Sequence, residues 1–172
     1  MGLISKSDFS PFFLLRGPHL QTIWAAKFRR KPVTKDIEWE QLELDDGDFL
    51  ELVWMKNPNR PTVVILPGLE GNFYTSTYVA CLMRTLYHQN LQGVLVHPRG
   101  CGRKVNRLPR SYHAGDIDDL ESAIQFISKK ISEFPVAIVG YSLGGNVLLR
   151  WLGLTQPNLL QTAVAVSVPF DL

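Results

Sequence analysis

The sequence predicts an α/β fold with a mostly parallel central sheet and helices on both faces, and three observations support this. Apolar segments of strand length alternate along the chain with segments whose apolar residues recur every three or four positions. The segments 62–66 and 93–96 are continuous apolar runs, typical of strands buried on both faces of a parallel sheet. Consecutive parallel strands need a crossover connection, which the helical segments between them supply.

The composition is that of an ordinary globular chain. Of its 172 residues 45% are apolar and 20% are charged, and the net charge is +2. This length suits one domain, and so small a net charge gives no reason to expect a nucleic-acid partner. We divide the chain into an N-terminal arm, residues 1–35, that packs on the domain, and a core domain, residues 36–172.

The arm carries aromatic residues and prolines without regular spacing, so we expect an irregular segment with one short helix near residues 20–28. The basic segment 27–31 is interpreted as a solvated face, with peripheral contact to an anionic membrane or an acidic partner as the alternative. The chain has two cysteines, no apolar run of about 18 residues and no secretory signal pattern, which predicts a cytoplasmic protein.

The core domain begins with a predicted β-hairpin. Alternating apolar residues at 39–44 and 49–55 flank a turn of sequence Asp-Asp-Gly-Asp. The clearest helix covers residues 116–131, with acidic residues in its first turns and Lys129 and Lys130 in its last, as the helix dipole favours. After the loop 57–61, the elements in order are a strand 62–66, a helix 76–88, a strand 93–96, the helix 116–131, a strand 135–139, a helix 143–154 and a strand 163–168.

Residues 140–144 read Gly-Tyr-Ser-Leu-Gly, a GxSxG motif between a predicted strand and a predicted helix. A sharp strand-to-helix turn strains the backbone of such a serine, and glycines two positions away on either side remove collisions that side chains would make. The turn places Ser142 at the carboxyl edge of the sheet, where open α/β sheets bind ligands. We therefore predict that Ser142 is a catalytic nucleophile, rather than a helix cap or a small turn residue.

Backbone N–H groups beside Ser142 complete this interpretation. The Leu143 N–H opens the next helix, whose positive dipole end favours an oxyanion. The loop 67–71 follows the strand 62–66, and the Leu69 N–H is our candidate for a second donor. GxGxxG and a P-loop lysine are missing and no His or Cys pair has metal-ligand spacing, so we expect neither a cofactor nor a metal.

The general base is the conflict in this sequence. With this serine turn an Asp or Glu and then a His normally follow the serine, but all four histidines precede Ser142 and the only acid after it is Asp171. The predicted sheet stops one strand beyond Ser142, so the strands that would carry the acid and the base are absent. Three hypotheses follow: a second polypeptide supplies them, the chain is a fragment, or an upstream histidine has taken over.

Two upstream histidines lie near the predicted site. His97 ends the strand 93–96 at the same sheet edge as Ser142, and His113 precedes the helix 116–131. We interpret both as loop histidines that position backbone, rather than as the base of a triad. Cys101 lies between two glycines and is interpreted as a small loop residue rather than a reactive thiol.

Short motifs occur in order along the whole chain: Phe9-Ser10-Pro11, Gly17-Pro18-His19-Leu20-Gln21-Thr22, Pro67-Gly68-Leu69-Glu70-Gly71, His97-Pro98-Arg99-Gly100-Cys101-Gly102, Arg110-Ser111-Tyr112-His113-Ala114-Gly115, Gly140-Tyr141-Ser142-Leu143-Gly144-Gly145-Asn146 and Ser167-Val168-Pro169-Phe170-Asp171-Leu172. Together they resemble the YheT-like branch of the α/β-hydrolase superfamily, which bacterial YheT hydrolases share with eukaryotic ABHD1- and ABHD3-type lipases.

The resemblance implies an esterase or lipase fold in which Ser142 matches the nucleophile. It also implies that relatives continue past Leu172 to an acid and a histidine, so residues 36–172 would be an incomplete α/β-hydrolase core domain, truncated after about strand six. The predicted function is a serine hydrolase acting on small-molecule or lipid esters. The alternatives are a catalytically incompetent remnant, which a complementary C-terminal polypeptide would complete, and a non-catalytic acyl-binding or interaction module.

Overall fold

The computed structural model describes residues 10–28, 36–131, 135–158 and 160–170. The chain forms two compact units, residues 1–31 and 32–172, which we describe separately. In the first unit a short 3-10 helix, Phe13–Leu15, precedes helix α1, Pro18–Phe28, which contains the predicted helix 20–28. Residues 29–31 of the basic segment and Asp171 lie outside the described residues, and both the packing of the arm and the contact of that segment with a membrane stay predictions.

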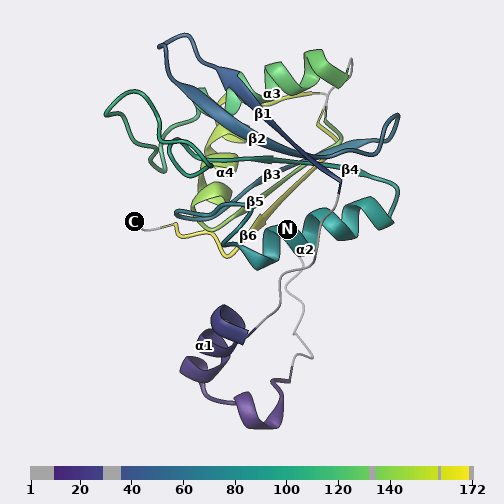
Figure 1. Ribbon diagram of the computed structural model, residues 1–172, viewed down its shortest axis with the longest axis vertical. Coiled ribbons are helices and arrows are strands. Elements are labelled where there is room, and N and C mark those ends of the chain that lie inside the picture. The colour runs from purple at the N-terminus through teal and green to yellow at the C-terminus, as the bar shows by residue number, and fades with distance from the viewer. Residues whose placement is uncertain (1–9, 29–35, 132–134, 159, 171–172) are drawn as a thin grey trace. The chain divides into compact units, whose positions relative to one another are not determined.

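The second unit is built on a sheet to which the described residues contribute six strands, in the order β1-β2-β4-β3-β5-β6 (Figure 1). Neighbouring strands among β4, β3, β5 and β6 are parallel, whereas β2 is antiparallel to both β1 and β4. The predicted hairpin and the mostly parallel sheet are confirmed. The strands are β1 (Ile37–Glu43), β2 (Phe49–Met55), β3 (Thr62–Leu66), β4 (Gln92–Val96), β5 (Ala137–Tyr141) and β6 (Thr162–Val166).

The last two strands end at different residues from those predicted. β5 continues to Tyr141 rather than residue 139, because Gly140 and Tyr141 still pair with β6. In the sequence, Gly140 suggests that the strand has ended. In the structure, this glycine allows the start of α4 to pack closely against β5. β6 ends at Val166 rather than residue 168, because the next residue, Ser167, has a φ of 52°, which no strand accommodates.

Helices lie on both faces of this sheet, as predicted (Figure 1). Val79 and Met83 of one helix pack on one face, and Leu120, Ile124 and Leu148 of the two others pack on the opposite face. None of the helices in the described ranges is both long and apolar enough to cross a membrane. The helices of this unit are α2 (Thr77–His88), α3 (Asp118–Ile131) and α4 (Leu143–Thr155).

A buried cluster of charges anchors the loop between β4 and α3. The Arg99 guanidinium, with 2% of its side chain exposed, lies 2.7 Å from Asp46 and 3.2 Å from Asp48, both in the turn between β1 and β2. It also contacts Asp119 of α3 at 2.7 Å. The acidic turn, which the sequence marks only as the end of a hairpin, therefore also holds a loop that reaches the carboxyl edge of the sheet.

Candidate active site

Ser142 lies between β5 and α4 in a backbone conformation that few non-glycine residues adopt. Its φ is 49° and its ψ is −115°, and a residue in such a conformation carries strain on the order of 1–3 kcal/mol. Its N–H donates to the Val166 carbonyl at 2.8 Å, and its own carbonyl accepts the Asn146 N–H at 3.0 Å. The sharp strand-to-helix turn that the GxSxG motif predicts is therefore present.

The glycines around Ser142 stand where backbone segments approach too closely for a side chain. A Cβ on Gly140 would lie 2.6 Å from the Gly144 carbonyl oxygen, and a Cβ on Gly144 would collide with the Pro67 carbonyl oxygen. Gly145, which is no part of the five-residue motif, is equally confined, because a Cβ there would lie 2.7 Å from Val168. These contacts bring the start of α4 against the end of β3.

At the start of α4, next to Ser142, the structure records no acceptor among the described residues for the N–H groups of residues 143–145. The Asn146 N–H makes the first intrahelical bond, to the Ser142 carbonyl, so the N–H groups of residues 143–145 precede the bonded turns. A helix N-terminus carries roughly half a positive charge. An oxygen that becomes negatively charged beside Ser142 would be stabilised at this helix end. The nearest donor along the chain is the N–H of the adjacent residue, Leu143.

The loop after β3 reaches Ser142 from another side. A Cβ on Gly68 would lie 3.3 Å from the Ser142 Cβ, so the two turns approach so closely that a side chain at position 68 would be crowded. The next residue, Leu69, has an exposed side chain. The structure thus brings the backbone of Leu69 and Leu143, the two predicted oxyanion donors, to the sheet edge where Ser142 lies.

His97 is bonded to backbone through both ring nitrogens. Its Nε2 accepts the Phe73 N–H at 3.2 Å, and its Nδ1 lies 2.9 Å from the Glu51 carbonyl oxygen, to which only a protonated Nδ1 can donate. The ring stacks on Trp39, and burial lowers the pKa of His97. Such a neutral ring positions backbone, as predicted, and has no nitrogen left to take a proton from Ser142.

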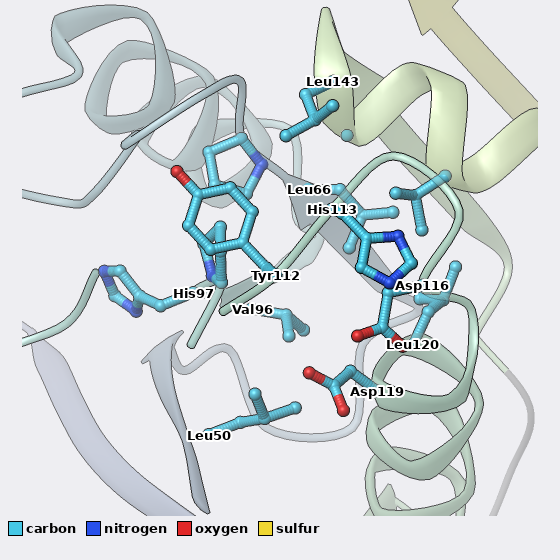
Figure 2. A pocket seen from close by; sticks show the side chains of 14 residues that line it. Leu50, Leu66, Val96, His97, Tyr112, His113, Asp116, Asp119, Leu120 and Leu143 are labelled. Carbon is cyan, nitrogen blue, oxygen red and sulfur yellow. The ribbon is translucent and has the colours of Figure 1, made fainter. Parts of the chain in front are cut away.

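A small cavity opens beside Leu143 (Figure 2). Its volume is about 70 Å³. Its walls come from the ends of β3 and β4, the loop after β4 and the starts of α3 and α4, and most of them are apolar, including Leu66 and Val147. His97 and His113 both line this cavity. In Figure 2 the His97 ring lies on the side away from His113.

His113 holds the turn that leads into α3. Its Nδ1 accepts the Gly115 N–H at 3.1 Å and its carbonyl accepts the Asp116 N–H at 3.0 Å. This matches the predicted role of a loop histidine. Among the described residues no hydrogen bond joins His113 to Ser142, so the third hypothesis, an upstream histidine acting as base, gains no support from the geometry.

Two residues of the site region carry no signal in the sequence. Tyr78 of α2 and Tyr112 of the loop after β4 bind the backbone of the loop after β3. Tyr112 lies within the motif 110–115, but nothing in that motif names its partner, which is 42 residues away. The spacing of apolar residues, which predicts helices and strands, does not report hydrogen bonds between a tyrosine and a distant loop.

The surroundings of Cys101 agree with its interpretation as a small loop residue. Burial raises the pKa of the Cys101 thiol, which disfavours the reactive thiolate. Within the described ranges no group of three or more His, Cys, Asp or Glu side chains could hold a metal ion. What the site offers is a hydroxyl on a strained turn, backbone donors on two sides and an apolar cavity, which suit the uptake of an acyl group.

Several known proteins are similar to this chain. The family described as alpha/beta hydrolase fold matches residues 61–172. The YheT protein of Escherichia coli is 38% identical, over 98% of this chain and 50% of its own length. Phospholipase ABHD3 of Bos taurus is 30% identical, over 77% of this chain and 34% of its own length. The chain thus spans half or less of the length of these curated relatives.

Among solved structures, the esterase Pf2001 of Pyrococcus furiosus matches with a TM-score of 0.62. The match covers 82% of this chain and 57% of the esterase, at 20% sequence identity. A likeness at this identity concerns the fold. It supports the arrangement of sheet and helices around the site.

Proposed function

This chain belongs to the alpha/beta hydrolase family, and we propose that it is a serine hydrolase of carboxylic esters with Ser142 as the nucleophile. The observation that carries the proposal is the backbone of Ser142, with a φ of 49° at the turn between β5 and α4. Strain of this kind persists only where the surrounding structure enforces it, and it is concentrated at functional sites. Relatives named as a phospholipase and as an esterase, the latter the YheT protein, agree with an ester substrate, whether a small molecule or a lipid.

The proposed reaction is acyl transfer through a covalent intermediate. The Ser142 hydroxyl oxygen attacks the carbonyl carbon of the ester while a base removes the hydroxyl proton. The N–H groups of Leu69 and Leu143 stabilise the negative carbonyl oxygen. The bond to the alcohol oxygen then breaks, the alcohol leaves with the proton, and water hydrolyses the acyl-enzyme to release the carboxylic acid and restore Ser142.

The base in this reaction is proposed to act from outside the described residues. His97 has both nitrogens bonded, and His113 is bonded within its own turn. Two hypotheses for its source stay open: a complementary C-terminal polypeptide, and a longer chain of which these residues are a fragment. We expect Ser142 to react faster when free imidazole, the smallest mimic of a histidine side chain, is added.

Labelling with a fluorophosphonate, followed by peptide mapping, tests the nucleophile. We expect the label on Ser142, more rapidly in the presence of imidazole, and no label at this position in Ser142→Ala. Ser128 of α3, whose hydroxyl oxygen is buried, serves as an internal control and should stay unlabelled. If the folded chain carries no label on Ser142 with or without imidazole, the proposal is wrong and a non-catalytic acyl-binding module is favoured.

We also propose that the acyl group enters the cavity lined by Leu143 and Gly144, the two residues that follow Ser142. Its volume of about 70 Å³ is about half of the roughly 150 Å³ in which benzene binds inside an engineered protein cavity, so it holds about three carbons. We therefore propose esters of short carboxylic acids, from acetate to butyrate, as the substrates that fit this cavity.

Enlarging a side chain in the cavity should shorten the acyl chain that is accepted. Val147 lines the cavity from α4, and Val147→Leu adds one methylene group. We expect kcat/KM for a butyrate ester to fall by about 10-fold and that for an acetate ester to change little. The control is Leu149→Met, on an exposed part of the same helix. An equal fall for both esters in Val147→Leu would show that the acyl group binds elsewhere.

A further inference from the structure

Two tyrosine hydroxyls hold the loop after β3, one on each side of Leu69. The Tyr78 hydroxyl accepts the Gly68 N–H at 3.0 Å, and the Tyr112 hydroxyl accepts the Glu70 N–H at 2.8 Å. The two tyrosines come from different elements, α2 and the loop after β4. For the N–H between them, that of Leu69, the structure records no acceptor among the described residues.

Residues 68–71 form a β-turn whose conformation is unusual for its sequence. The Gly71 N–H donates to the Gly68 carbonyl at 2.9 Å, which closes the turn. Glu70, its third residue, has a φ of 53°, the sign that a type II turn requires at this position, where glycine or asparagine is usual. A glutamate is strained there, so another interaction must favour the type II form over type I.

The bond to Tyr112 is such an interaction. Types I and II differ by a flip of the central peptide unit, here the one between Leu69 and Glu70. A flip would turn the Glu70 N–H away from the Tyr112 hydroxyl and change the backbone conformation at Leu69. The hydroxyl therefore stabilises one orientation of this peptide unit.

We propose that Tyr78 and Tyr112 are positioning residues: they hold the turn 68–71 in its type II form and occupy the Gly68 and Glu70 N–H groups, so that of these three neighbouring N–H groups only that of Leu69 is left for the oxyanion. This inference rests on the proposed function, because it assigns a task to the donors beside Ser142. The N–H groups before and after Leu69 are occupied and cannot compete for the oxyanion. A donor that is fixed before the reaction needs no reorganisation during it, which is the main source of oxyanion stabilisation.

Both tyrosines are themselves held in place. The Tyr78 ring packs against that of Tyr141, the residue before Ser142, with centroids 4.6 Å apart. The Tyr112 hydroxyl also interacts with the Cys101 thiol. Burial raises the pKa of Tyr112, so its hydroxyl stays protonated at neutral pH. These contacts link the donor loop both to the turn that carries Ser142 and to the loop after β4.

Kinetics of the full chain with a short-chain activated ester, in the presence of imidazole, test this role. In Tyr112→Phe and in Tyr78→Phe we expect kcat to fall by about 10-fold each, which is less than the loss when an oxyanion donor is deleted. KM should stay within about 2-fold of the wild-type value. Tyr87→Phe, at the far end of the helix that carries Tyr78, is the matched control and should leave both constants unchanged.

A rescue experiment separates positioning from general damage. Glycine tolerates a positive φ, so Glu70→Gly should hold the type II turn without help from Tyr112. We expect the double variant Tyr112→Phe with Glu70→Gly to recover about half or more of the lost kcat. Failure of this rescue, or a loss that falls on KM instead of kcat, overturns the proposal.

Amide hydrogen exchange gives a readout that does not depend on turnover. We expect faster exchange of the Glu70 amide in Tyr112→Phe and of the Gly68 amide in Tyr78→Phe, with the core strands unchanged. Faster exchange with unchanged kcat overturns the positioning role while leaving the proposed function standing. Absence of any label on Ser142 in the wild-type chain overturns the proposed function itself. The labelling of wild type is measured before the tyrosine variants, so the two failures can be distinguished.

Discussion

Replacing Ser142 with glycine is expected to abolish ester hydrolysis and fluorophosphonate labelling, and at the same time to raise the free energy of unfolding. Loss of the nucleophile should leave less than about 10⁻⁴ of the wild-type turnover. The φ of 49° at this position strains any residue with a Cβ by about 1–3 kcal/mol, and glycine avoids most of this strain. Because glycine also gives the unfolded chain more freedom, we expect a net gain of about 1 kcal/mol.

The matched control for this prediction is Ser142→Ala. Alanine removes the hydroxyl but keeps the Cβ, so it should lose labelling as completely as glycine without the gain in stability. Urea denaturation of the three proteins measures the difference. Equal stability of the glycine and alanine variants would mean that the turn does not strain its serine.

Replacing Arg99 with methionine is expected to lower the free energy of unfolding by about 3–5 kcal/mol, the usual result of removing one partner from a buried ion pair. The guanidinium is 2% exposed and faces three carboxylates, of which that of Asp48 is fully buried. Methionine retains much of the buried volume, so the loss reports mainly the charges left without a partner. Urea denaturation near pH 7 measures it.

The difference between wild type and Arg99→Met should shrink in acid. Burial by itself raises the pKa of Asp48, but the N–H groups of Arg107 and Phe49 outweigh it, together with Arg99, and the pKa lies below its ordinary value. The Asp48 N–H and the Arg99 guanidinium lower the pKa of Asp46 in the same way. Carboxylates of this kind stabilise the fold above their unfolded pKa, near 4, and this stabilisation is lost as the pH falls through the lower folded pKa.

In the variant the pKa of Asp48 should be higher than in wild type. Burial, which favours the protonated carboxyl, is then opposed by the Arg107 and Phe49 N–H groups without the guanidinium, so acid relieves part of the uncompensated charge. The two stability curves should therefore converge below about pH 4. Arg107→Met is the control, because its pair with Glu43 is exposed and should contribute little. Equal losses in the two variants, or a difference independent of pH, would contradict a role for the buried charges.

Much of the fold follows from local patterns in the sequence. The hairpin, the continuous apolar strands and the charged ends of the helix near residue 120 were all predicted within a few residues of their observed bounds. The predicted end of β5 was wrong because we interpreted Gly140 as the start of a turn. This glycine lies within the strand, and it is there because α4 packs too closely for a side chain. Periodicity reports which side of an element is buried, but not what lies against it.

The candidate site divides in the same way. Ser142 could be identified from the sequence because glycines lie at fixed distances from it, between a strand and a helix. Their role, to avoid steric collisions in the turn, is local in the chain. His97 shows the opposite case: its position at the end of a strand made it a candidate, and only its partners, the backbone of residues 51 and 73, assign it to the framework. Likewise, nothing in the sequence around Arg99 indicates which three carboxylates it contacts.

By itself the sequence determined the α/β class, the order of the elements and the turn that holds Ser142, because each depends on residues close together in the chain. The tertiary structure alone decided the strand order, the burial of Arg99 among carboxylates and the two tyrosines on either side of Leu69. These are contacts between residues tens of positions apart. The hydrogen bonds that orient the Leu69 backbone form only when the ends of β3 and β4 and the start of α2 have come together, and no local pattern encodes that meeting.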